Sequence, residues 1–307
     1  MQNDREGTVP SKLRAMALAA AVCFIYAAFA LSPPPEGLAA GKKALWKISS
    51  KDNIVYLLGS IHYLKPQNYP LDPVMESAFK NSKRVIFEID LDDAKEEQAQ
   101  HVMVSKAAYT DGTTLKNHVS EATYKLAEEK LKELGLDIAL LNPFKPWFAA
   151  NMILARSMQK MGFDPGQGID QYFFRKAKQE TKEIGGLETL EFQLDLFNKM
   201  PDFVQDLMLL QTVRGADTMP AMMDTVVKAW AAGDLKTLDA TLLQGMREFP
   251  EVYQRVVVER NRAWLPQIES FLSQKVNYLV VVGAGHLAGR DGLIEALKAK
   301  GYSVEQL

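Results

Sequence analysis

The sequence has very few of the residues that build disulfides and most metal sites. Its 307 residues include one cysteine, Cys23, and four histidines. A single cysteine excludes a disulfide within the chain and every zinc site that needs several cysteine ligands. A site built on histidine must therefore use His62, His101, His118 or His286. Of these, His101 and His118 lie in polar sequence and are expected to be solvated.

The chain also has little excess charge of either sign. Lys and Arg number 36 and Asp and Glu number 38, which gives a formal net charge of -2. Proteins that bind nucleic acid need a basic surface, so no nucleic-acid partner is expected. Hydrophobic residues make up 47% and charged residues 24% of the chain. This composition is typical of a globular protein and excludes disordered, collagen-like and polytopic membrane classes.

One long uncharged apolar run lies near the N-terminus, at residues 15–31. Basic residues precede it and small residues end it, which is the order found in a secretory signal peptide. Cleavage after Ala30 or after Ala40 fits this pattern. The run is also just long enough to cross a bilayer, so the alternative is an uncleaved anchor through this run alone. We therefore expect residues 1–40 to direct export to the periplasm or out of the cell.

The remaining residues, 41–307, predict a single α/β domain. Short apolar runs rich in Val and Ile are typical of buried strands. They lie towards the two ends of this region, at 44–50, 54–58, 85–89, 278–282 and 302–307, and a further short strand is expected to begin at Ile184. The segment from about 92 to 273 has helical periodicity, with breaks expected at Pro201, Gly233 and Pro266. The pattern predicts a central mixed sheet formed by the N- and C-terminal segments, with a large helical insertion between them.

Two predicted strands lead into the same short motif. Gly-Ser-Ile-His occupies residues 59–62, and Gly-Ala-Gly-His occupies residues 283–286. In open α/β sheets, ligands bind beyond the carboxyl ends of the strands, and glycine lets the chain turn there. The alternative is that each motif is a loop with a solvated or packed histidine. We expect His62 and His286 to face the same crevice, where neutral imidazoles can bind a metal or a proton.

Glu88 is a third candidate because it interrupts the apolar strand predicted at 85–89. A buried carboxylate is costly unless it has a partner, a metal ligand role or a place at the wet end of the strand. The alternative is that Glu88 and Asp90 share a solvent-facing edge.

A weaker group of candidates comprises Glu188, Arg260 and Asp170. Glu188 can supply a second carboxylate, and Arg260 can hold a carboxylate or polarise a substrate carbonyl. The alternatives are a helix start for Glu188, a surface ion pair for Arg260 and a helix cap for Asp170.

Together these motifs resemble the TraB/PrgY/GumN family, which includes the Tiki metalloproteases, and most closely its bacterial GumN-like branch. The resemblance runs from about residue 44 to residue 307. It rests on the motifs at 59–62, 87–90, 186–189, 259–261, 281–287 and 301–304. It implies a fold akin to the erythromycin esterase and ChaN-like proteins. In Tiki proteins, two Gly-x-x-His motifs and a glutamate are associated with proteolysis that depends on a divalent metal.

Carried over to this chain, the resemblance makes His62, His286 and Glu88 the metal or catalytic set. The hypothesis is an exported metal-dependent hydrolase, a peptidase acting on peptides or proteins, with Zn, Mn, Co or Fe as the divalent ion. Glu88 is either a ligand or the general base, while Glu188 and Arg260 position groups or stabilise the transition state. The alternatives are a metal-independent esterase and a non-enzymatic exported protein that binds metal, haem or peptide. The oligomeric state stays open.

Overall fold

The computed structural model describes residues 41–90 and 96–307, and a mixed sheet of six strands lies at its centre. The strands lie in the order β4-β3-β5-β2-β1-β6. Their bounds are β1 (Leu45–Ser49), β2 (Ile54–Ser60), β3 (Arg84–Phe87), β4 (Glu183–Gly186), β5 (Tyr278–Gly283) and β6 (Val304–Gln306). Strands β2, β5, β3 and β4 are mutually parallel, and β1 and β6 add an antiparallel edge. The predicted α/β class with a central mixed sheet is confirmed.

Helices make up most of the chain between β3 and β5. The α-helices of the described residues are α2 (Pro73–Asn81), α3 (Glu96–Ala107), α4 (Leu115–His118), α5 (Glu121–Glu133), α6 (Pro146–Lys160), α7 (Ile169–Gln179), α8 (Leu190–Asn198), α9 (Asp202–Gly215), α10 (Met219–Ala231), α11 (Leu235–Leu238), α12 (Pro250–Tyr253), α13 (Glu259–Leu272), α14 (Ala284–Leu287) and α15 (Leu293–Ala299). Strand β4 confirms the short strand expected from Ile184. The insertion is therefore not helical throughout, because it supplies one edge of the sheet.

The three predicted helix breaks have different outcomes. The chain leaves helix between α8 and α9 just before Asp202, and α10 ends before Gly233, which has a φ of +63°, so these two breaks are confirmed. The break at Pro266 is wrong, because this proline lies inside α13. Pro266 and Arg262 are both exposed, so a carbonyl that loses its intrahelical partner there can bond to water instead.

Helices α7 and α13 cover opposite faces of the sheet. Phe87 of β3 lies against Phe174 of α7, with ring centroids 5.7 Å apart, while Tyr278 of β5 stacks on Phe271 of α13 at 4.6 Å. The register places Phe87 beside Val281, an odd number of positions from Tyr278. Because side chains alternate along a strand, Phe87 and Tyr278 must point to opposite faces. The sheet is therefore covered by a helix on each face.

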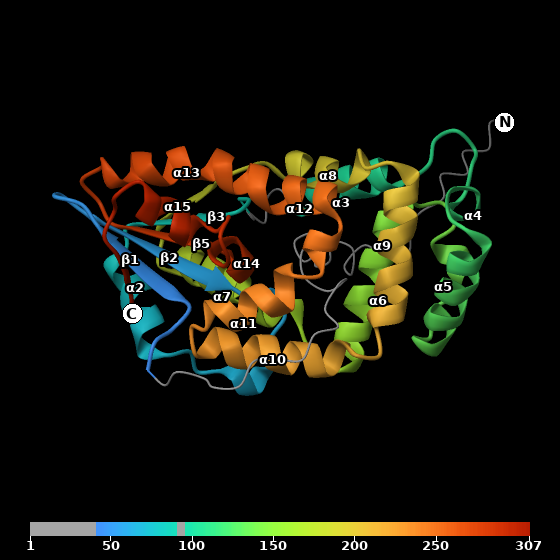
Figure 1. The fold of residues 1–307 in the computed structure, drawn as a ribbon, viewed down its shortest axis with the longest axis horizontal. Coiled ribbons are helices and arrows are strands. Elements are labelled where there is room, and N and C mark those ends of the chain that lie inside the picture. Colours follow the sequence, from blue (N-terminus) through green and yellow to red (C-terminus); the bar gives the residue numbers. More distant parts are fainter. Residues whose placement is uncertain (1–40, 91–95) are drawn as a thin grey trace.

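The sheet and the helical insertion share one cluster of buried hydrophobic residues. Figure 1 shows the sheet at one end of the molecule and helices α5, α6 and α9 gathered at the other. Among the described residues, no helix combines the length and apolar character needed to cross a membrane. The run at 15–31, where a signal peptide or anchor is expected, lies outside the described residues.

Candidate functional site

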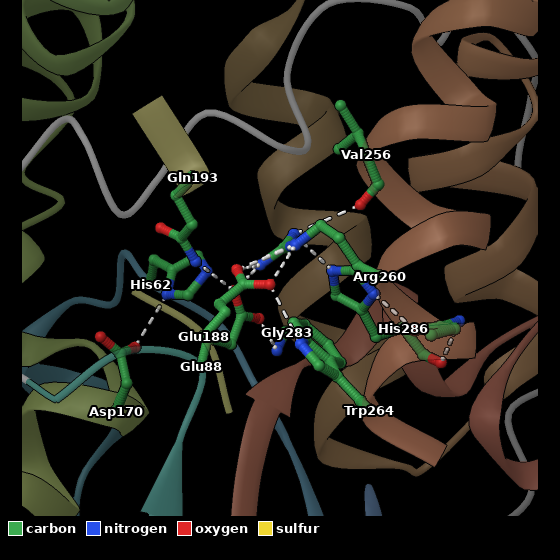
Figure 2. Close-up of polar contacts among 11 residues, drawn as sticks. His62, Glu88, Asp170, Glu188, Gln193, Val256, Arg260, Trp264, Gly283 and His286 are labelled. Carbon is green, nitrogen blue, oxygen red and sulfur yellow. Dashed lines mark hydrogen bonds and ion pairs between the residues drawn. The ribbon is translucent and has the colours of Figure 1, made fainter. Parts of the chain in front are cut away.

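Four side chains that the sequence singled out lie just beyond the carboxyl ends of the four parallel strands. His62 follows β2, Glu88 follows β3, Glu188 follows β4, and His286 lies in α14 directly after β5. Parallel strands end at the same edge of a sheet, so the residues that follow them meet there. His62 is 6%, Glu88 5% and His286 0% exposed. The predicted convergence is observed, and Figure 2 shows the side chains around one centre.

Arg260 of α13 lies at the middle of this group, and it is 0% exposed. Its Nη2 donates to Oε2 of Glu88 and to Oε1 of Glu188, both at 2.6 Å, and its Nε donates to the two oxygens of Glu188 at 3.0 and 3.2 Å. Its Nη1 donates to Nε2 of His286 at 2.9 Å and to the carbonyl of Val256 at 3.3 Å. One guanidinium thus joins both glutamates and one histidine (Figure 2). A surface ion pair, the alternative for Arg260, is excluded by its burial.

The helix that carries Arg260 is locally irregular. Helix α12, a π-helical turn at Gln254–Val258 and helix α13 follow one another without interruption. Such π turns are frequent at functional sites, and each one changes the direction in which the following side chains point. The guanidinium of Arg260 returns a hydrogen bond to Val256 within this turn. The turn therefore sets the direction of the arginine side chain and accepts one of its hydrogen bonds.

His286 is held as a neutral imidazole with one defined tautomer. Arginine only donates, so Nε2 of His286 accepts the bond from Arg260, and the ring proton must be on Nδ1. That proton is donated to Oδ1 of Asn261 at 2.7 Å. Burial and the positive charge of Arg260 lower the pKa of His286 to about 3. His286 is therefore uncharged at neutral pH, and both ring nitrogens are engaged.

His62 forms a different pair on the other side of the centre. Its Nδ1 lies 2.9 Å from Oδ1 of Asp170, and both side chains are buried. Burial lowers the pKa of His62, but the charge and hydrogen bond of Asp170 and the charge of Glu88 outweigh it, so that the pKa is raised above 6.5. Asp170 was one of the weaker functional candidates, with a helix cap as the alternative. It lies in the first turn of α7 and also orients His62.

Gly168 is what lets Asp170 approach His62. It is the N-cap of α7, and the next residue, Ile169, donates its backbone N–H to the carbonyl of Ile61 at 3.1 Å. A Cβ at position 168 would lie 2.5 Å from the carbonyl oxygen of His62. No side chain fits there, because the clash is with backbone that cannot rotate away. Glycine thus allows α7 to begin directly against the loop that carries His62.

The two glutamates differ in proton affinity although both bind Arg260. Burial raises the pKa of Glu88, but the charge of Arg260, the charge of protonated His62 and the N–H of Gly283 outweigh it and lower the pKa to about 2. For Glu188, burial is the largest effect, and with the negative charge of Glu88 it outweighs Arg260, so that the pKa is raised. Glu88 is therefore ionised, and Glu188 is the first of the pair to take up a proton as pH falls.

The predicted metal-ligand set of His62, Glu88 and His286 does not fit a divalent ion in this arrangement. A metal needs a lone pair from each ligand at about 2.0–2.2 Å. The Nε2 lone pair of His286 and an oxygen of Glu88 instead accept hydrogen bonds from Arg260. In the described part of the chain, no group of three or more His, Cys, Asp and Glu side chains is placed to hold a metal. The guanidinium therefore takes up the lone pairs that two members of the predicted set would offer to an ion.

Several polar residues that complete the centre were not predicted. Trp264 donates from Nε1 to Oε2 of Glu188 at 3.0 Å, and Gln193 donates to Oε2 of Glu88 at 3.1 Å. Asn261 directly follows Arg260 in the sequence, so the Glu-Arg-Asn motif contained a signal for it. Gln193 has no such signal, because it is one polar position in the amphipathic helix α8. Its role follows only from where that helix packs.

The other two histidines lie away from the centre. His101 is exposed, as predicted. His118 is not simply solvated, so that prediction is wrong. Its Nδ1 lies 2.7 Å from Asp202 and its Nε2 lies 2.8 Å from Thr113, while its ring stacks on Tyr109 with centroids 4.2 Å apart. These contacts join the segment before α5 to the start of α9, which is a structural role.

The pKa values of the two buried histidines are expected to lie on opposite sides of the ordinary histidine value, with His62 above it and His286 below it. In an NMR titration of the ring protons, His62 should lose its proton above pH 6.5, whereas His286 should stay neutral until about pH 3. With only four histidines, single substitutions assign every signal. In Asp170→Asn the pKa of His62 should fall below 6.5, because burial remains while the carboxylate charge is gone. A His62 pKa that is unchanged in Asp170→Asn would contradict the pairing.

Comparison with known proteins places the chain among related sequences. The profile of the TraB/PrgY/gumN family matches residues 44–306. A protein from Amphimedon queenslandica named "Metalloprotease TIKI homolog" is 28% identical over 166 residues, which cover 45% of this chain and 32% of the relative. A protein of the same name from Nematostella vectensis is 22% identical over 305 residues, which cover 81% of this chain and 64% of the relative.

The alignments therefore span less than two thirds of either relative's length. No solved structure matches this chain. The family profile, in contrast, extends from the start of β1 to the end of β6 and includes every residue of the centre described above. From this match we conclude that the chain belongs to the TraB/PrgY/gumN family.

Proposed function

We propose that this chain is a hydrolase in which His62 acts as the general base. The observation that carries the proposal is the buried His62–Asp170 pair beside the ion group of Glu88, Arg260 and Glu188 (Figure 2). A carboxylate bonded to one ring nitrogen sets the tautomer and direction of a catalytic histidine, as in hydrolase triads. A histidine with a pKa near the working pH is suited to take a proton from an attacking water.

Arg260 has a narrower role in this proposal than the sequence suggested. A guanidinium has five N–H donors, and here the donors on Nε, Nη1 and Nη2 are engaged by Glu188, His286, Val256 and Glu88. No donor is left to bind a substrate carbonyl directly. Its fixed positive charge acts by holding Glu88 ionised beside His62, and the charge of Glu88 in turn raises the pKa of the base.

The proposed substrate is a peptide or protein outside the cytoplasm. The word "metalloprotease" in the names of both relatives supports cleavage of peptide bonds. The apolar run at 15–31, with its basic flank, supports export or anchoring. Because His62, Glu88 and His286 are almost completely buried, a segment near the centre must move aside before a peptide bond can reach them.

Metal-dependent hydrolysis is the second candidate, and the names of the relatives favour it. On the His62 side the arrangement suits a metal ligand, since a carboxylate commonly binds the second ring nitrogen of a ligating histidine. On the other side, His286 and Glu88 would have to give up their bonds to Arg260. As they stand, these residues do not fit an ion, because Arg260 takes up the lone pair of His286 and an oxygen of Glu88.

The test is hydrolysis of peptide and ester libraries by the full chain, with and without a chelator, together with elemental analysis. The His62 mechanism predicts cleavage that persists after chelation and well under one divalent ion per chain. Loss of cleavage on chelation, with recovery on adding back one metal, would instead establish the metal-dependent candidate. If no library member is cleaved but haem, metal or a peptide binds tightly, the protein is a binding protein and the hydrolase proposal is overturned.

A further inference from the structure

We infer that Arg260 is the built-in cation of this centre and occupies the place that a divalent ion would take between Glu88, Glu188 and His286. We call this place the cation position. The inference does not rest on hydrolysis, because it concerns only which cation these three side chains hold. It makes a prediction about metal binding by variants of this chain that activity measurements do not address.

The atoms around the guanidinium are of the kinds that bind transition metals. Glu88 and Glu188 contribute carboxylate oxygens, and His286 contributes an imidazole nitrogen. Zn, Mn, Co and Fe all bind sets of carboxylate and imidazole ligands. These side chains come from three separate segments of the chain and converge on one point. In this structure the group at that point is Arg260.

The guanidinium is fixed at the cation position more firmly than an ordinary surface arginine. It is 0% exposed, and its Nε, Nη1 and Nη2 all donate to the surrounding side chains or backbone. A guanidinium keeps its positive charge at any physiological pH. A divalent ion that approached Glu88 or His286 would meet this fixed charge at short range, where repulsion in a buried site is strong. The arginine therefore excludes the ion by both space and charge.

Glu88, Glu188 and His286 each have a further hydrogen-bond partner that lies outside the cation position. Gly283 donates its N–H to Oε1 of Glu88 at 2.7 Å, Trp264 donates to Glu188 at 3.0 Å, and Asn261 binds Nδ1 of His286 at 2.7 Å. Outer hydrogen bonds of this kind orient the ligands of metal sites. Removing the guanidinium would leave two oriented carboxylates and one imidazole with a total charge equal and opposite to that of a divalent ion.

The test is to titrate the full chain with Co²⁺ and to follow the visible absorption of the bound ion and the thermal unfolding temperature. Arg260→Ala is expected to bind about one Co²⁺ per chain at least tenfold more tightly than the wild type, and its unfolding temperature should rise on binding. Arg262→Ala is the matched control, since Arg262 lies in the same helix but is exposed. It should behave like the wild type. Adding His286→Ala to Arg260→Ala should abolish the new binding.

Arg260→Met, which keeps the side-chain length without the charge, is the second variant if Arg260→Ala does not fold in the absence of metal. The inference is overturned if either variant folds and binds Co²⁺ no more tightly than the wild type. It is also overturned if the wild type itself binds Co²⁺ tightly and His286→Ala removes that binding, a comparison that needs no arginine variant. None of these results depends on a substrate, so failure of the hydrolase assay leaves this test intact.

Discussion

Replacing Arg260 with alanine is expected to lower the free energy of unfolding by about 3–5 kcal/mol in metal-free buffer, since it leaves buried charge without a partner. Glu88 and Glu188 both bind the guanidinium at 2.6 Å, and their side chains are only 6% and 7% exposed. Without the cation, the two carboxylates face each other in a site that water reaches poorly. Urea unfolding of the full chain with a chelator present measures the change.

Arg262→Ala is the control for this prediction, because it removes the same side chain from an exposed position of α13. It should change the free energy of unfolding by no more than about 0.5 kcal/mol. A triple variant, Arg260→Met with Glu88→Gln and Glu188→Gln, should recover part of the loss, since it removes the stranded charges as well as the cation. A loss below about 1 kcal/mol in Arg260→Ala would mean that the guanidinium does not hold this centre together.

His62→Ala is expected to lower kcat/KM by about 10²–10⁴-fold on whichever substrate the libraries identify, which is the usual contribution of a general base. His62 is the histidine whose pKa is raised, and it lies beside ionised Glu88. His101→Ala, at an exposed position, is the control and should retain full activity. Thermal unfolding of both variants must accompany the assay, so that loss of activity can be separated from loss of folding.

The pH dependence of activity is expected to follow from the His62–Asp170 pair. Only neutral His62 can accept a proton, so activity should fall as pH decreases through the raised pKa of His62. Asp170→Asn removes the charge that raises this pKa, so the acid limb of the profile should move to lower pH while kcat decreases. If the acid limb does not move in Asp170→Asn, a group other than His62 causes it, and the proposed role of His62 is contradicted.

Much of the fold and part of the centre could be predicted because the signals are local. Apolar runs ending in glycine indicated β2 and β5, and the two Gly-x-x-His motifs placed His62 and His286 at the ends of those strands. Glu88 and Glu188 follow two further strands, and because parallel strands end at one edge of the sheet, these side chains lie near the two histidines. Pro266 shows the limit of such signals, because an exposed helix face tolerates a proline that a local pattern treats as a break.

By itself, the sequence determined which strands carry chemical groups and at which edge those groups meet, since strand periodicity and turn residues act over a few positions. Only the tertiary structure decided which cation lies among them. Arg260 is 172 positions from Glu88 and 72 from Glu188, and a π turn sets the direction of its helix. Asp170 pairs with His62 across 108 positions in the same way. Buried charge must be neutralised by whatever the packing brings within reach, and in this protein packing brings an arginine.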